Sequence, residues 1–196
     1  MRVTIIGEYG YLQALLGLGL SYGITSEKSL EDLSSDVELL NKLQAVGPKL
    51  ILRGEEHCKF LESMIVYIDL SAPRYFHQQL DTYRVGITKQ SGSTMHTILR
   101  HPLAQKDFVH FVLPQTLSRL NELVESRSFE QLKAELPEGF LQRRILCTNY
   151  RTLSRIIKQR YNHRLAEWQL FIQSVRDGVR YPDFLGYPEA EDIDDS

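Results

Sequence analysis

The stretch Met64–Leu70 (MIVYIDL) constrains the fold more than any other part of the chain. It is rich in β-branched and aromatic residues, which indicates a buried strand. Ser71-Ala72-Pro73 follows directly, and a proline in the first turn favours the start of a helix, expected here over Pro73–Arg84. Gly86 and Gly92 then bound a Ser/Thr-rich segment. This segment predicts an irregular loop, of the kind that positions ligands on a rigid scaffold.

Periodic apolar residues predict several further elements. Val3, Ile5 and Ile6 indicate a short opening strand. Spacings typical of helices place four more segments: Tyr11–Leu20, Val37–Val46 with a stop at Gly47-Pro48, residues 103–136 with Pro114 as a break or first turn, and Tyr150–Val179. The chain therefore combines strands with helices.

Composition predicts one soluble globular domain over residues 1–188. The chain has 196 residues, of which 42% are hydrophobic and 24% charged. Five acidic residues lie in an acidic tail over residues 189–196, and taking them out of the net charge of −2 leaves residues 1–188 with +3. This surplus is too small to predict nucleic-acid binding, for which a domain pI above about 9 is expected. It is compatible with a small anionic ligand.

The cysteines, the histidines and the apolar runs indicate which metal sites, disulfides and cellular locations to expect. Cys58 and Cys147 are too few for a disulfide framework or a four-thiolate metal site, and the six histidines are dispersed without metal-ligand spacing. The N-terminus lacks the apolar run of a secretory signal, and Tyr11–Leu20 is far shorter than the roughly 20 residues that span a bilayer. We expect a cytoplasmic protein with no bound metal and no membrane contact.

The helix expected after Asn149 carries Arg160 and Arg164 on the face formed by its apolar residues. A guanidinium directed toward a core needs an anion or several acceptors, because an unpaired buried charge is strongly unfavourable. Two explanations fit. One is an internal salt bridge with a buried Asp or Glu, and the other is a site for an anion or a nucleobase.

A second basic group also has two explanations. Arg151, Arg155 and Lys158 share the opposite face of the same helix, and Arg143 and Arg144 lie just before it. Solvated surface charge is the ordinary explanation, and phosphate binding is the other. The end of the helix expected after Pro73 lies directly before the glycine-bearing loop. Its side chains include hydrogen-bond donors that a nucleotide could use: Gln78, Gln79, Tyr83 and Arg84.

Two blocks of the chain carry a distinctive spacing. In the first, His57 and Glu62 precede the strand, Ala72-Pro73 follows it, and Gln79 and Arg84 lie on and after the helix. In the second, Leu136-Pro137 is followed twelve positions after the proline by Asn149-x-Arg151-x-Leu153, and Arg160 comes nine residues after Arg151. With these residues the chain resembles the flavin-dependent thymidylate synthases.

The resemblance implies a fold and a reaction. The fold is α+β (α/β), with a mixed sheet flanked by long helices. The reaction is an FAD-dependent transfer of a one-carbon unit from methylenetetrahydrofolate to C5 of a pyrimidine deoxynucleotide monophosphate, dUMP to dTMP, with NADPH as reductant. Family members are homotetramers with active sites at subunit interfaces, so the resemblance implies self-association.

The resemblance also implies roles for individual residues. Arg160 is the expected catalytic residue, which contacts the uracil and favours its ionisation at N3. The residues expected at the flavin are His57, Arg84, Gln90, Asn149, Arg151 and Arg155. Those expected at the nucleotide, besides Arg160, are Gln79, Thr82, Ser91, Ser93 and Lys133. Lys133 replaces a family arginine directed at the phosphate, and lysine keeps the charge but lacks the bidentate fork.

The loop after the helix departs from the family signature. The family has Arg-His-Arg, seven residues, Ser, one residue and Arg, whereas this chain has Thr82-Tyr83-Arg84, six residues to Ser91, and then Gly92 and Ser93. Two alternative functions on the same fold therefore remain open. One is a nucleotide 5-hydroxymethylase or dCMP methylase, and the other is an inactive nucleotide-binding or regulatory protein.

Overall fold

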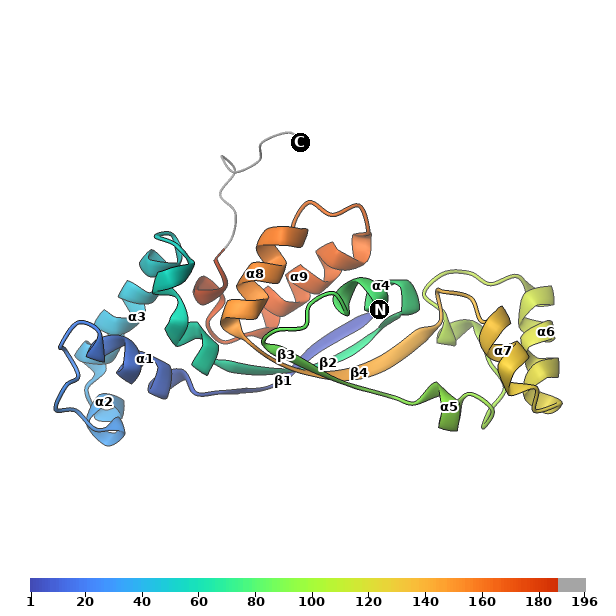
Figure 1. Ribbon diagram of the computed structural model, residues 1–196, viewed down its shortest axis with the longest axis horizontal. Helices are drawn as coiled ribbons and strands as arrows, with labels where there is room; N and C mark the ends of the chain where they lie inside the picture. The colour runs from blue at the N-terminus through green and yellow to red at the C-terminus, as the bar shows by residue number, and fades with distance from the viewer. Residues whose placement is uncertain (187–196) are drawn as a thin grey trace. The chain divides into compact units, whose positions relative to one another are not determined.

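The computed structural model describes residues 1–186, so the acidic tail over residues 189–196 lies outside the described part. The backbone forms two compact units (Figure 1). The first unit comprises Met1–Val3, Asp69–Arg84 and Lys89–Leu146. The second comprises Thr4–Ile68, Val85–Thr88 and residues 147–186. The single domain predicted over residues 1–188 stays a prediction.

The strands form one four-stranded sheet in the order β1-β2-β4-β3. The sheet is antiparallel, not mixed as expected, and the α+β class is confirmed. An antiparallel sheet can leave one face open to solvent, whereas a parallel sheet needs cover on both faces. The strands are β1 (Arg2–Tyr9), β2 (Ile65–Pro73), β3 (Ile87–Ser91) and β4 (Leu141–Asn149).

Two of these strands were not predicted from the sequence. The segment predicted as an irregular loop between Gly86 and Gly92 contains β3, and Gly92 at its end donates its backbone N–H to the carbonyl of Arg143 in β4 at 2.8 Å. Arg143 and Arg144 stand in the middle of β4, which hides the apolar alternation that normally indicates a strand. Both arginines have acidic partners in the first unit, so the strand tolerates them.

The second unit is mainly helical. Its core is built around Leu15, Leu43, Ile156, Trp168 and Phe171, all of which are buried. Helix α1 has the predicted bounds. The helices are α1 (Tyr11–Leu20), α2 (Leu30–Ser35), α3 (Val37–Ile51), α8 (Tyr150–Arg160) and α9 (Ala166–Gly178), with short 3₁₀ segments η1 (Glu55–His57), η2 (Lys59–Ser63) and η4 (Pro182–Leu185).

Two helix boundaries in this unit differ from expectation. The expected stop at Gly47-Pro48 is wrong, because α3 continues to Ile51. Gly47 is buried against the ring of Phe184, so tertiary packing holds the helix through the proline despite its lost backbone donor. The continuous helix over Tyr150–Val179 is also wrong. It consists of α8 and α9, which pack together and are joined by residues 161–165 (Figure 1).

The first unit has a small core of its own. It contains α4 (Arg74–Leu80), α5 (Thr94–Thr97), η3 (Gln105–Asp107), α6 (Pro114–Glu125) and α7 (Phe129–Glu135). Helices α6 and α7 lie side by side (Figure 1) and bury Leu120, Leu123 and Leu132. The helix expected over Pro73–Arg84 ends at Leu80, and the one expected over 103–136 is α6 and α7, preceded by a largely irregular segment.

Candidate functional site

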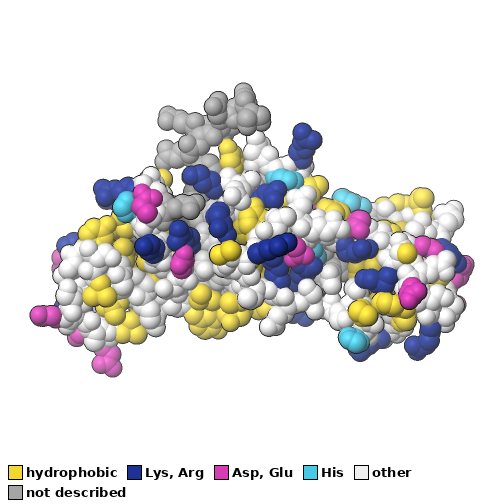
Figure 2. Space-filling model, viewed as in Figure 1, with side chains coloured by type: hydrophobic (Ala, Val, Ile, Leu, Met, Phe, Trp, Pro, Cys, Tyr) yellow, Lys and Arg dark blue, Asp and Glu magenta, His cyan; other side chains and the backbone are white. Residues whose placement is uncertain are grey.

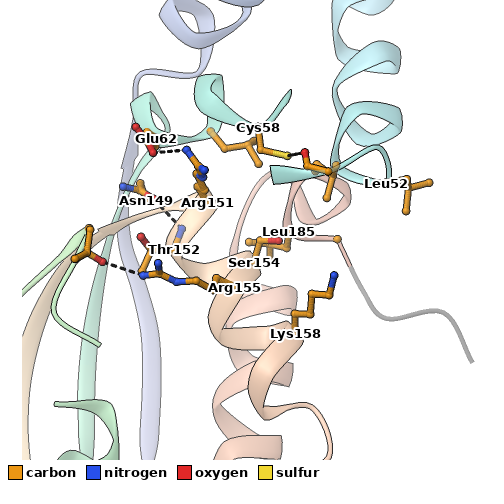
Figure 3. Close-up of a pocket in the computed structure, with 16 residues that line it drawn as sticks. Leu52, Cys58, Glu62, Asn149, Arg151, Thr152, Ser154, Arg155, Lys158 and Leu185 are labelled. Carbon is orange, nitrogen blue, oxygen red and sulfur yellow. Dashed lines mark hydrogen bonds and ion pairs between the residues drawn. The ribbon is translucent and has the colours of Figure 1, made fainter. Parts of the chain in front are cut away.

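Helix α8 lines a cavity of about 790 Å³ that lies entirely within the second unit (Figure 3). The other walls come from the end of α3, the η1–η2 region, the turn at residues 85–86 and the segment at 185–186. Pockets of this size are typical of small-molecule and cofactor sites. The lining residues are Ile51, Leu52, Gly54, Cys58, Leu61, Glu62, Val85, Gly86, Asn149, Arg151, Thr152, Ser154, Arg155, Lys158, Leu185 and Gly186.

Asn149 sets the start of α8 at the cavity. Its side-chain oxygen accepts a hydrogen bond from the backbone N–H of Thr152 at 2.8 Å, which caps the helix. From that start, a spacing of four and then three residues places Arg151, Arg155 and Lys158 on one face. All three line the cavity, which confirms the prediction that they share a helical face.

The three cations differ in their contacts. Arg151 pairs with Glu62, with 2.5 Å between its NH1 atom and Oε1. Arg155 donates from its NH2 atom to the backbone carbonyl of Val85 at 3.2 Å. Lys158 is exposed, and no carboxylate among residues 1–186 pairs with it. Figure 2 shows Lys and Arg side chains gathered over α8. One carboxylate therefore faces three cations, so the cavity favours an anionic ligand.

Gly86 brings the neighbouring turn against the start of α8. Its φ of +73° is a conformation that favours glycine, and a Cβ atom there would lie 2.2 Å from Oγ1 of Thr152. Thr148 fixes the turn from the other side, since its hydroxyl donates to the Gly86 carbonyl at 2.8 Å. This close approach presents the Val85 carbonyl to Arg155.

The remaining wall of the cavity is apolar. It is formed by Ile51, Leu52, Leu61, Val85 and Leu185. Cys58 also lines the cavity but is largely buried, with its thiol 3.3 Å from the Gly54 carbonyl. A cavity with cations on one side and aliphatic side chains on the other suits a ligand that has both an apolar part and an anionic part.

Arg160 is in the same unit but on another face of α8. Its guanidinium carbon lies 5.1 Å from the ring centroid of Trp168, which is buried. Nearby, burial and the positive charges of Arg160 and Arg164 lower the pKa of His163. Arg160 is half-buried, whereas Arg164 is exposed in the α8–α9 connection, so the expectation of two arginines within one apolar helix face is wrong for Arg164.

His57, a residue of the second unit that is expected at the flavin, does not line the cavity. Its side chain is exposed in η1, and Nε2 lies 3.6 Å from Oε1 of Glu56. The structure therefore brings Asn149, Arg151 and Arg155 together at the cavity, and leaves His57 and Arg160 outside the lining.

The remaining predicted residues belong to the first unit. Thr82 donates its hydroxyl to the Gln79 carbonyl at 2.7 Å, so these two lie together at the end of α4. Gln90 and Ser91 are exposed at the end of β3, and Ser93 is the residue before α5. Lys133 Nζ donates to Oγ1 of Thr94, 2.8 Å away, which places it beside Ser93. Arg84 is exposed after α4.

Arg143 and Arg144 have carboxylate partners. The sequence left two explanations for these arginines, solvated surface charge and phosphate binding. Arg143 forms a bidentate pair with Asp69, with both N–O distances 2.8 Å. Its hydrogen bonds hold the pKa of Asp69 below the ordinary value. Arg144 pairs with Asp81 at 2.7 Å. Both arginines therefore form ion pairs within the first unit.

Sequence reasoning missed several parts of the site. The apolar wall at Leu52 and Leu185 comes from segments without a motif, so no signal in the sequence indicated it. Gly86 was available as a signal, because a glycine between a helix and a strand often marks a close backbone approach. Among residues 1–186 there is no cluster of metal-ligating side chains and no helix long and apolar enough to cross a bilayer.

Two solved structures share this fold. Both are crystal structures of the flavin-dependent thymidylate synthase ThyX from Helicobacter pylori with FAD and dUMP. Their TM-scores are 0.73 and 0.72 at 16% and 17% sequence identity. The matches cover 94% and 95% of this chain and 98% and 100% of theirs. No protein-family model and no curated protein sequence matches the chain. The chain therefore has the fold of the flavin-dependent thymidylate synthases.

Proposed function

We propose that the chain transfers a one-carbon unit from methylenetetrahydrofolate to C5 of a pyrimidine deoxynucleotide, dUMP to dTMP, with FAD as cofactor and NADPH as reductant. The observation that carries the proposal is the cavity at the start of α8, lined by Asn149, Arg151 and Arg155 in a chain with the ThyX fold. Fold alone does not define a reaction, so the site must carry the argument.

The residues at the cavity fit FAD. Arg155 and Lys158 offer donors and positive charge to a diphosphate, and Asn149 and Arg151 stand at the capped end of the helix. The aliphatic wall provides an apolar surface for a ring. When bound, FAD would supply the hydride chemistry, while the protein contributes binding, orientation and electrostatics. His57, Arg84 and Gln90 are proposed as further flavin contacts.

Arg160 is proposed to act on the base. Its guanidinium is half-buried against the indole of Trp168, where a positive charge stabilises an ionised pyrimidine more strongly than it does in water. It would hold negative charge at N3 and so make C5 more nucleophilic. The other proposed contacts to the nucleotide are Gln79, Thr82, Ser91, Ser93 and Lys133.

Two features support the proposal that the chain works as an oligomer, a homotetramer by the family resemblance. Nine positions along α8 turn Arg160 about 180° away from Arg151, so one copy presents the cavity and Arg160 on opposite helix faces. Ile6 and Tyr9 of β1 are also 52% and 63% exposed, Tyr67 of β2 is exposed beside Tyr9, and Figure 2 shows a hydrophobic group over these strands. A second copy would cover this patch and bring the two helix faces together.

A specific observation favours the alternative of a nucleotide 5-hydroxymethylase or dCMP methylase. The family signature begins with an arginine where this chain has Thr82, and the Thr82 hydroxyl donates to the Gln79 carbonyl. A cation is therefore replaced by a side chain that is already hydrogen-bonded, which changes the groups available to the base or its substituent.

Cofactor binding and product analysis test these proposals. We expect purified protein to bind FAD with a flavin absorption band, and to convert dUMP into dTMP with methylenetetrahydrofolate and NADPH, followed by mass spectrometry. Hydroxymethylated or methylated dCMP products would instead identify the alternative reaction. FAD binding without turnover of either nucleotide would support the inactive protein. A colourless protein that takes up no FAD at saturation would overturn the flavin proposal.

A further inference from the structure

Lys133 is a half-buried cation without a carboxylate partner. It lies in the last turn of α7, and its Nζ donates to Oγ1 of Thr94 at 2.8 Å. No Asp or Glu among residues 1–186 forms an ion pair with it. Burial of such a charge is unfavourable unless an anion compensates it. The position is therefore suited to an anionic ligand.

Arg74 supplies a second positive charge at this position. It is the first residue of α4, and its side chain is 27% exposed. NH1 donates to the carbonyl of Leu136 at 3.0 Å, three residues beyond Lys133. Burial, and then the positive charge of Arg74, lower the pKa of Lys133. Two cations therefore lie close together in the first unit.

One carboxylate lies near Arg74 but does not neutralise both cations. Oε1 of Glu138 is 3.3 Å from NH2 of Arg74, and its Oε2 accepts from Nε2 of Gln78 at 3.1 Å. Glu138 is 49% exposed, so it can turn toward solvent when another anion approaches. The two contacts of Arg74 use two of the five N–H donors of a guanidinium, which leaves donors for a ligand.

We propose that Arg74 and Lys133 together bind the phosphate of the nucleotide, with Arg74 supplying the bidentate fork that a lysine at position 133 lacks. The inference rests on the proposed function for the identity of the ligand, and it adds a residue that the family resemblance does not provide. Thr94 orients the ammonium group, and Arg74 offers parallel N–H donors to two phosphate oxygens.

The test compares dUMP with deoxyuridine, which differs only in lacking the phosphate. Isothermal titration of the full chain, Arg74→Gln and Lys133→Gln should show dUMP affinity about tenfold or more weaker in each variant, because a charge-assisted hydrogen bond is lost. Deoxyuridine affinity should not change. Arg119→Gln is the matched control, since Arg119 is an ion-paired arginine of the same unit, bound to Glu135. Unchanged dUMP affinity in Arg74→Gln would overturn the inference.

Two further measurements keep the test valid if a variant fails to fold, and they distinguish failure of the phosphate site from failure of the proposed function. Glu138→Gln removes the competing carboxylate of a half-exposed side chain, so it should bind dUMP severalfold more tightly. Equal or weaker binding by the folded variant would count against the site. Inorganic phosphate should raise the pKa of Lys133, measured by ¹³C NMR of methylated lysines, and Arg74→Gln should abolish this rise. A phosphate response without dUMP binding would sustain the anion site and reject the proposed function.

Discussion

The hydroxyl of Tyr150, the first residue of α8, donates a hydrogen bond to the carboxylate of Glu8 in β1. The other oxygen of Glu8 accepts from the backbone N–H of Arg180 at 3.0 Å, and the N–H of Tyr181 donates to the Tyr150 hydroxyl at 3.3 Å. Burial and then the hydrogen bond to Glu8 raise the pKa of Tyr150 far above its ordinary value. The arrangement fixes the chain just before Leu185, which lines the cavity.

Tyr150→Phe should lower the free energy of unfolding by about 1–3 kcal/mol, because it leaves the enclosed Glu8 carboxylate without its side-chain donor. Chemical denaturation followed by circular dichroism measures this change. Tyr22→Phe is the control, since Tyr22 is 50% exposed and its loss of a hydroxyl should be nearly neutral. Equal stabilities of the two variants would mean that the Tyr150–Glu8 hydrogen bond contributes nothing.

His77 predicts a pH dependence of stability in the first unit. Its side chain is buried, and a ring N–H at Nε2 donates to the Gln142 carbonyl at 2.8 Å. Burial lowers its pKa from 6.5 to about 4. The unfolded chain therefore binds more protons between these values, so stability is full above pH 6.5 and falls as the pH drops toward 4, by about 3 kcal/mol at most.

His77→Gln should make unfolding less dependent on pH in this window, because glutamine keeps an N–H donor but takes up no proton. Denaturation midpoints at intervals between pH 4 and 6.5 measure the difference. His101→Gln, at an exposed position, should follow the unmodified chain. If the slopes of all three proteins agree, the ring of His77 titrates normally in the folded state.

The sequence predicts the elements that depend on local patterns and misses those that depend on distant partners. Helix α1 follows from local apolar residues, and the start of β2 follows from a local run of β-branched and aromatic residues. Strand β4 does not, because Arg143 and Arg144 are compatible with a sheet only through Asp69 and Asp81, more than 60 residues away in the chain. Likewise, α3 continues past Gly47 because Phe184 packs there, which no local signal indicates.

The candidate site likewise has features that the sequence predicts and features that depend on distant partners. The spacing of Arg151, Arg155 and Lys158 predicts a common helical face, and the structure places all three at the cavity. The partners of these residues are not predictable from spacing. Glu62 and the Val85 carbonyl reach α8 only through tertiary folding. Arg74 comes near Lys133 only because its side chain donates to the carbonyl of Leu136, just after α7.

Glu62→Gln should strengthen FAD binding about two- to fivefold, because Arg151 must give up its ion pair with Glu62 before it can bind a ligand anion. The gain is small, since Glu62 is 57% exposed and the pair is partly screened by water. A flavin fluorescence titration measures the dissociation constant. Glu122→Gln, which removes an ion-paired carboxylate of α6, is the control. Weaker FAD binding by Glu62→Gln would show that this carboxylate contacts the cofactor directly.

Mixing two inactive variants tests whether active sites are shared between copies. Arg155→Ala removes a cation from the cavity, and Arg160→Ala removes the proposed catalytic group on the opposite face of α8. If one copy provides the cavity and another provides Arg160, random co-assembly restores about a quarter of the sites. We therefore expect each variant to have little activity alone and the co-refolded mixture to recover about a quarter of normal turnover. Mixing two preparations of the same variant is the control, and a mixture as inactive as its components would place both residues in a site built by one copy.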